Sequence, residues 1–66
     1  MTNLKKIREA SGFSQAKLAE ESGVSVRMIQ HYEQGVKDIN NAAALTVYRL
    51  AQALSVTVED LLEKAE

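Results

Sequence analysis

The chain has 66 residues, of which 45% are hydrophobic and 26% charged, with a formal net charge of −1 and no cysteine. Such a length supports one domain at most, and the composition is that of a globular protein rather than of a disordered segment. The lack of cysteine excludes disulfides, thiolate zinc sites and cysteine nucleophiles, and the single histidine, His31, cannot form a metal site alone. We expect one domain over residues 1–66, without a cofactor or a metal.

The amino-terminal residues contain no apolar segment of the length that a signal peptide needs, and no apolar run approaches the length of a membrane span. We therefore expect a cytoplasmic protein with no membrane partner. The sequence also contains no pairing of a nucleophile with a base and no phosphate-binding glycine loop. These features predict that the protein is not an enzyme, and no small-molecule site is evident.

Apolar residues recur at steps of three and four over nearly the whole chain, and no stretch alternates with a period of two. This spacing predicts an all-α fold, a compact bundle of five short helices. The first helix is expected over about residues 3–11. Leu4 and Ile7 form its inner stripe, and Gly12 closes it.

Two serines, Ser14 and Ser25, predict the starts of the second and third helices, because serine is a preferred N-cap residue. Each follows an apolar residue and precedes another at the fourth helical position, the pattern of a hydrophobic staple. The two apolar pairs are Phe13 with Leu18 and Val24 with Ile29. We expect helices over residues 15–22 and 26–34, joined by a tight turn in which Gly23 is left-handed.

The fourth helix is expected to start near Asn40 or Asn41, since either residue can cap it. Its broad apolar face would comprise Leu45, Val47, Tyr48, Leu50, Ala51 and Leu54. Thr57 would cap a last helix over about residues 58–64, with Leu61 and Leu62 turned inward.

Two short helices joined by a three-residue turn that contains glycine form a helix-turn-helix, here over residues 15–34, whose second helix enters the major groove of DNA. The sequence resembles the lambda-repressor/Cro-like, or xenobiotic-response-element-like, helix-turn-helix domains of bacteria and phages. The matching segments are residues 14–19 (SQAKLA), 23–25 (GVS), Ile29, residues 32–35 (YEQG), residues 50–56 (LAQALSV) and residues 61–62 (LL). The resemblance extends from Leu4 to Leu62 and implies that residues 26–34 are the recognition helix.

A helical wheel with Ile29 and Tyr32 facing inward places Arg27, Gln30, His31 and Gln34 on the outward side. The predicted base-contacting residues are Val26, Arg27, Met28, Gln30 and His31. Arg27 is the leading candidate for a base contact, because a guanidinium can bind guanine O6 and N7 together. The alternative is that Arg27 contacts a phosphate or is simply solvated. His31 either reads a base or faces solvent, and Val26 and Met28 either touch a base edge or pack against the turn.

The resemblance and the helix N-termini also predict contacts with DNA phosphates, which set register rather than sequence. The predicted residues are Ser14, Gln15, Lys17, Ser25, Gln34 and Lys37. Arg8 and Glu33 match positions that form a buried ion pair in some relatives, and the alternative is an exposed pair of little energetic value.

One segment and two single residues depart from the family pattern. Residues 36–44 are longer than the usual loop and lack proline, so the fourth helix could start early. Ser55 stands where a glycine often closes that helix, and Asp60 stands where some relatives place an apolar dimer contact.

The predicted function is a sequence-specific regulator that binds double-stranded DNA, a repressor that acts as a homodimer on a palindrome. Charge is compatible with this function: residues 1–49 hold seven basic and five acidic side chains, a balance of +2, and residues 50–66 hold one basic and four acidic, a balance of −3. The alternative is a protein-interaction module on the same fold, such as an antitoxin or an anti-repressor, which the near-neutral net charge also fits. On charge alone, plain solvated helix faces fit equally well.

Overall fold

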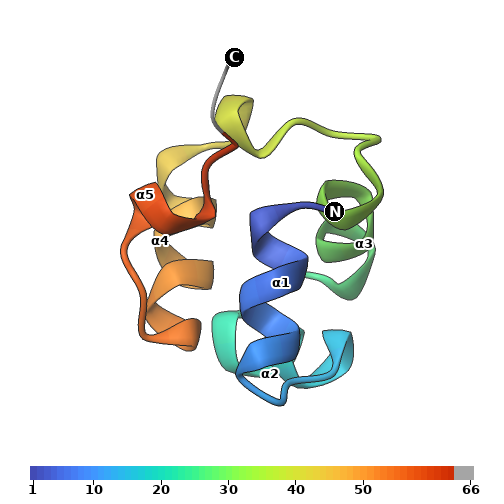
Figure 1. The fold of residues 1–66 in the computed structure, drawn as a ribbon, viewed down its shortest axis with the longest axis vertical. Coiled ribbons are helices and arrows are strands. Elements are labelled where there is room, and N and C mark those ends of the chain that lie inside the picture. The colour runs from blue at the N-terminus through green and yellow to red at the C-terminus, as the bar shows by residue number, and fades with distance from the viewer. Residues whose placement is uncertain (64–66) are drawn as a thin grey trace.

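The computed structural model describes residues 1–63, and this part of the chain folds into helices without a strand (Figure 1). The elements are α1 (Asn3–Ala10), α2 (Gln15–Ser22), α3 (Val26–Gln34), the 3₁₀ helix η1 (Ile39–Asn41), α4 (Ala44–Leu54) and α5 (Val58–Leu61). The all-α fold with five α-helices is therefore confirmed.

The predicted bounds of the second and third helices are confirmed, and local hydrogen bonds explain them. The Ser14 hydroxyl accepts from the backbone N–H of Lys17 at 3.0 Å, and the Ser25 hydroxyl accepts from Met28 at 3.1 Å. Each serine thereby satisfies one of the four N–H groups that a helix start leaves without a partner. Gly23 ends α2 with a φ of 76°, the left-handed conformation that favours glycine.

The hydrophobic core joins all five α-helices. Each of them contributes one of the largest fully buried side chains, which are Leu4, Leu18, Ile29, Leu50 and Leu61. α2 packs against α3 and α4, and α5 packs against α4 and α1. Because every α-helix contributes to it, the position of each helix depends on the same core. Truncating any one of these side chains to alanine would lower the free energy of unfolding by about 2–5 kcal/mol.

The predicted start of the fourth helix at Asn40 or Asn41 is wrong. Both residues belong to η1, and the backbone is extended at Ala42 and Ala43 before α4 begins at Ala44 without a side-chain cap. The Asn40 side chain bonds instead to the backbone of Glu63, donating to its carbonyl at 2.6 Å and accepting from its N–H at 2.8 Å. A tertiary contact has therefore taken the groups that would have capped the helix.

The predicted apolar face of α4 is partly wrong as well. Its buried residues are Val47, Leu50, Ala51 and Leu54, which follow one stripe of the helix, whereas Leu45 is 56% exposed and Tyr48 is 52% exposed. A helix packed on one side buries positions i, i+3, i+4 and i+7. The other apolar residues remain on the surface.

The ends of α1 and α5 differ slightly from the expected ones. α1 ends at Ala10 with Ser11 as its cap, and α5 ends at Leu61, whereas the expected end at Lys64 lies outside the described residues. Thr57 caps α5 as predicted, in a reciprocal capping box with Asp60. Hydrogen bonds of 2.8 Å from Asn3 to the carbonyl of Leu62 and to the carboxylate of Glu63 connect the end of the described chain to the start of α1.

Candidate nucleic-acid interface

α2 and α3 form the candidate interface. They pack against each other and are joined by residues 23–25, with the left-handed Gly23 at the bend (Figure 1). α3 buries Ile29 and Tyr32 against the core, as the helical wheel predicts. This arrangement leaves the opposite side of α3 available to a ligand.

The five predicted base-contacting residues differ in exposure. Arg27 is exposed and forms no ion pair within residues 1–63, so its guanidinium donors are free. Gln30 and His31 are half-buried. Val26 is half-buried too, and Met28 packs against the core, which favours the packing alternative for Met28.

His31 has only one ring nitrogen that can reach a ligand. Its Nδ1 is buried and has no hydrogen-bond partner among the described residues. A base or phosphate contact by His31 would therefore have to use Nε2.

The predicted phosphate-contacting residues lie at the start of α2, at the start of α3 and after α3. Gln34 and Lys37 are exposed, and Lys37 forms no ion pair within the described chain. Lys17 instead pairs within α2, 3.0 Å from Glu21 and 3.9 Å from Glu20. The hydrogen bond with Glu21 raises the pKa of Lys17, so a phosphate would compete with this pairing.

The Ser14 and Ser25 hydroxyl oxygens accept their capping bonds, which leaves each O–H free to donate. At both helix starts, free backbone N–H groups and the positive end of the helix dipole also favour an anion. These two N-termini therefore suit phosphate groups.

Arg8 and Glu33 form a buried ion pair that joins α1 to α3. Arg8 Nε lies 2.6 Å from Glu33 Oε2, and Nη2 lies 3.0 Å from Oε1. The two side chains are 10% and 3% exposed. The remaining Nη1 donates to the carbonyl of Phe13 at 2.8 Å, so the guanidinium fixes the entry into α2 as well.

The ion pair extends into a hydrogen-bond network that sequence reasoning missed. Gln15 Nε2 donates to Glu33 Oε1 at 3.0 Å, and Gln30 Nε2 donates to Gln15 Oε1 at 3.4 Å. The sequence predicted a phosphate contact for Gln15, a base contact for Gln30 and a structural role for Glu33. No local signal connects them, because the three residues meet only through the packing of α2 on α3.

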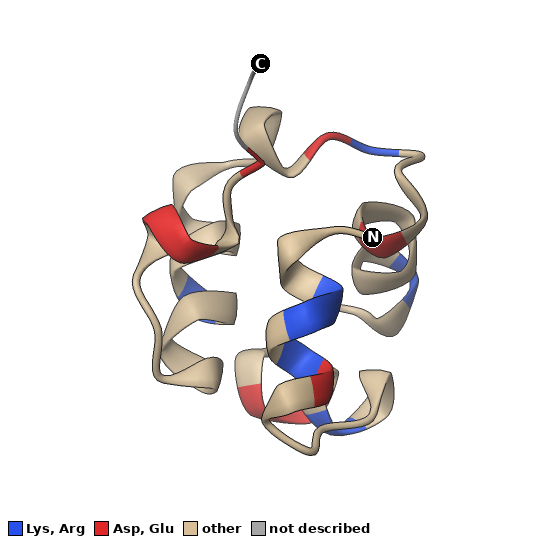
Figure 2. Ribbon diagram, in the orientation of Figure 1, with Lys and Arg blue, Asp and Glu red and all other residues tan. Residues whose placement is uncertain are grey.

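The end of the described chain is acidic. Figure 2 shows the acidic residues of α5 on the side of the molecule away from α3, whereas α1, α3 and the loop after α3 carry basic as well as acidic residues. Within the described residues after position 49, Glu59, Asp60 and Glu63 are the charged side chains. A polyanion therefore meets less repulsion at the α3 side than at the α5 side.

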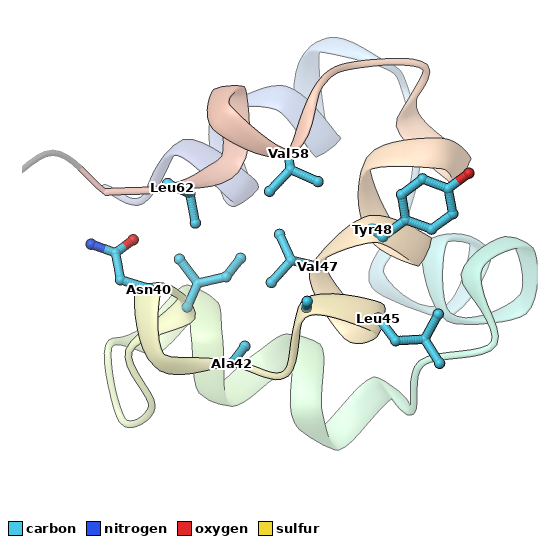
Figure 3. Close-up of a pocket in the computed structure, with 9 residues that line it drawn as sticks. Asn40, Ala42, Leu45, Val47, Tyr48, Val58 and Leu62 are labelled. Atoms are coloured by element: carbon cyan, nitrogen blue, oxygen red, sulfur yellow. The ribbon is translucent and has the colours of Figure 1, made fainter.

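An apolar groove of about 520 Å³ lies between the start of α4 and α5 (Figure 3). Its lining residues are Ile39, Asn40, Ala42, Ala44, Leu45, Val47, Tyr48, Val58 and Leu62. None of them belongs to α2 or α3, so the groove is separate from the candidate DNA-binding helices.

Two further properties concern residues 1–63 only. Within this range, no helix has both the length and the apolar character that a membrane crossing requires. In the same range, no three histidine or carboxylate side chains lie close enough together to hold a metal ion.

A family model described as helix-turn-helix matches residues 4–61 of the chain. No curated protein and no solved structure shows a significant match. The matched segment contains α2, the turn and α3 together with the helices that pack around them. On this match and this geometry, the chain belongs to the XRE/lambda-repressor-like helix-turn-helix family of DNA-binding regulators.

Proposed function

We propose that this regulator is a repressor that recognises a specific operator sequence in double-stranded DNA with α3 in the major groove. The observation that carries the proposal is Arg27, which is exposed, forms no ion pair with any residue up to Glu63 and lies on the side of α3 opposite the buried Ile29 and Tyr32. An arginine in this position can bind O6 and N7 of guanine together, a contact worth roughly 1–3 kcal/mol of discrimination.

The remaining contacts divide into base readers and phosphate anchors. In this proposal the half-buried Gln30 and His31 flank Arg27 as further base readers, with Val26 at the groove edge. The anchors are the serine-capped starts of α2 and α3, with Gln15, together with Gln34 and Lys37 after the recognition helix. Lys17 joins them only by exchanging its partner Glu21 for a phosphate.

We propose that the regulator binds a palindromic operator as a homodimer and represses by occupying it. Half-sites of such operators lie roughly one helical turn, about 34 Å, apart. The longest extent of the domain, 31 Å, is close to this separation, so two copies on successive turns would lie next to each other when their long axes follow the DNA. The exposed Leu45 and Tyr48 beside the apolar groove supply a surface that a second copy would cover (Figure 3).

The test is a selection from random duplexes at low salt, followed by titrations of the selected operator over a range of salt concentrations. Affinity should fall steeply with salt, with a slope set by the number of phosphate contacts. Lys37→Ala should weaken binding to all sequences alike and reduce the slope by about 1, whereas Arg27→Ala should relax the preference at one base pair. Failure to enrich any duplex would overturn the proposal, and equal losses on operator and random DNA would remove Arg27 as a base reader.

A second candidate, a protein-interaction module such as an antitoxin or an anti-repressor, is supported by the apolar groove and by the net charge of −1. The two candidates differ in whether they need the recognition helix. Leu45→Glu, in the groove, would disrupt both an interaction module and the dimer of a regulator, so it does not separate them. Arg27→Ala would leave an interaction module unchanged, whereas it would relax the base preference of a regulator at one position of the operator.

A further inference from the structure

A continuous chain of polar contacts connects the buried ion pair to the surface of the recognition helix. It starts at Arg8 on α1, passes through Glu33 and Gln15, and ends at Gln30 on α3. We infer that Gln30 reads an adenine in the operator, and that Gln15 and Glu33 are positioning residues that set the orientation of its amide. The inference rests on the proposed function and names part of what the site recognises.

The anchor of the chain is the Glu33 carboxylate. Both of its oxygens accept from Arg8, at 2.6 and 3.0 Å, and the side chain is only 3% exposed. An ionised carboxylate can accept hydrogen bonds but cannot donate them. Any neighbour that bonds to Glu33 must therefore present a donor.

Gln15 meets this requirement by turning its Nε2 toward Glu33 Oε1, at 3.0 Å. The opposite orientation of the Gln15 amide would place its oxygen against a carboxylate oxygen, which is repulsive. The Gln15 Oε1 is consequently directed away from Glu33, and it accepts from Gln30 Nε2 at 3.4 Å. The charge state of Glu33 thus determines which atom Gln15 offers to Gln30.

The contact with Gln15 changes what Gln30 can recognise. A free glutamine amide can donate both N–H groups, and so could bind the two acceptors of guanine, O6 and N7. Once one N–H is held by Gln15, Gln30 retains one N–H donor beside the Oε1 acceptor. Of the four bases, only adenine offers an acceptor and a donor together on its own major-groove edge, N7 and N6.

The experiment compares adenine with guanine at one operator position. Selection from random duplexes with the wild type and with Gln30→Ala identifies the position that depends on Gln30. The ratio of affinities for adenine and guanine at that position is then measured for the wild type, Gln30→Ala, Gln15→Met and the double variant Gln15→Met/Gln30→Ala. Gln15→Met keeps the length of the side chain without the amide, and Gln15→Ala serves as a second variant without it. Lys37→Ala is the control for loss of a phosphate contact, and thermal unfolding shows that each variant is folded at the assay temperature.

The wild type should prefer adenine by roughly 5- to 150-fold, the range of a good bidentate contact. Gln30→Ala should bring the ratio close to one. Gln15→Met should lower it several-fold, because the second N–H of Gln30 becomes free to donate to guanine. The double variant should match Gln30→Ala, whereas Lys37→Ala should weaken both duplexes and leave the ratio unchanged.

Three results would overturn the inference. If Gln15→Met and Gln15→Ala weaken both duplexes but keep the ratio, Gln15 acts only as a phosphate anchor and does not position Gln30. If Gln30→Ala alters no position, or alters one that does not prefer adenine, Gln30 is not the adenine reader; an enriched operator would still support the proposed function. If the wild type enriches no operator, the proposed function fails and the inference fails with it.

Discussion

Replacing Arg8 by alanine tests whether the buried ion pair holds α1, α2 and α3 together. The guanidinium donates twice to Glu33 and once to the Phe13 carbonyl, and the Arg8 residue is 9% exposed. The alanine variant leaves a carboxylate buried with Gln15 as its remaining partner. Breaking a buried pair in this way costs about 3–5 kcal/mol.

The loss is large for a chain of this size. Domains have roughly 0.05–0.15 kcal/mol of stability per residue, or about 3–10 kcal/mol for 66 residues. At about 4–8 °C per kcal/mol, we expect the melting temperature of Arg8→Ala to fall by at least about 12 °C. Urea denaturation followed by far-UV circular dichroism measures the free energy of unfolding directly.

Two controls separate the ion pair from a general effect of losing an arginine. Arg49 on α4 is exposed and forms no ion pair within residues 1–63, so Arg49→Ala should change the free energy of unfolding by less than about 0.5 kcal/mol. The double variant Arg8→Met/Glu33→Met removes both charges and should recover much of the stability that Arg8→Ala loses. A cost below about 1 kcal/mol for Arg8→Ala would refute the reasoning, because the pair would then behave as an exposed one.

The pH dependence of the Arg8 contribution has a defined sign. The hydrogen bonds that Arg8 donates to Glu33 raise the pKa of Arg8 above its ordinary value, against the opposing effect of burial. A pKa that is higher in the folded than in the unfolded protein stabilises the fold fully at any pH below the pKa of the unfolded state. This stabilisation is lost only as the pH rises through the pKa of the folded state. Titration of Arg8 should therefore add no pH dependence to stability between about pH 5 and 11.

Three further substitutions test other parts of the structure. Ser55 closes α4 at a φ of 58°, so Ser55→Gly should stabilise the protein by about 0.5–1 kcal/mol in urea denaturation; a loss would show that the left-handed conformation is not strained. Asn40→Ala removes both hydrogen bonds to the Glu63 backbone and should cost about 1 kcal/mol and speed amide exchange at Glu63. Unchanged exchange there would contradict that role of Asn40. Leu45→Glu should abolish the dimer in sedimentation analysis while leaving stability within about 0.5 kcal/mol, because Leu45 is 56% exposed; a persistent dimer would place the interface elsewhere.

Predictions from the sequence were most accurate where the determining interactions are local. The start of α2 at Gln15 depends on Ser14 and on apolar residues within five positions, and its bounds were predicted correctly. The start of α4 was predicted incorrectly because the capping groups of Asn40 bond to Glu63, which lies 23 positions away. A capping signal predicts a helix start only when no distant partner takes the same groups.

The exposed apolar residues of α4 illustrate a second limit. Hydrophobic spacing placed Leu45 and Tyr48 on the same buried face as Leu50, but one stripe of the helix is buried and these two residues lie outside it. The spacing of apolar residues shows that α4 has an apolar side, which is wider than the stripe that the helix buries. It does not show which edge of that side faces the core.

The sequence by itself determined the all-α class, the helix-turn-helix over residues 15–34 and the inward side of α3, because caps, staples and helical spacing act between neighbours in the chain. Only the tertiary structure decided that Gln15 lies between Glu33 and Gln30 and that Asn40 binds Glu63. The physical reason is that a side-chain hydrogen bond needs its two atoms within about 3 Å. Distances of that size between separate helices are set by how their buried side chains pack.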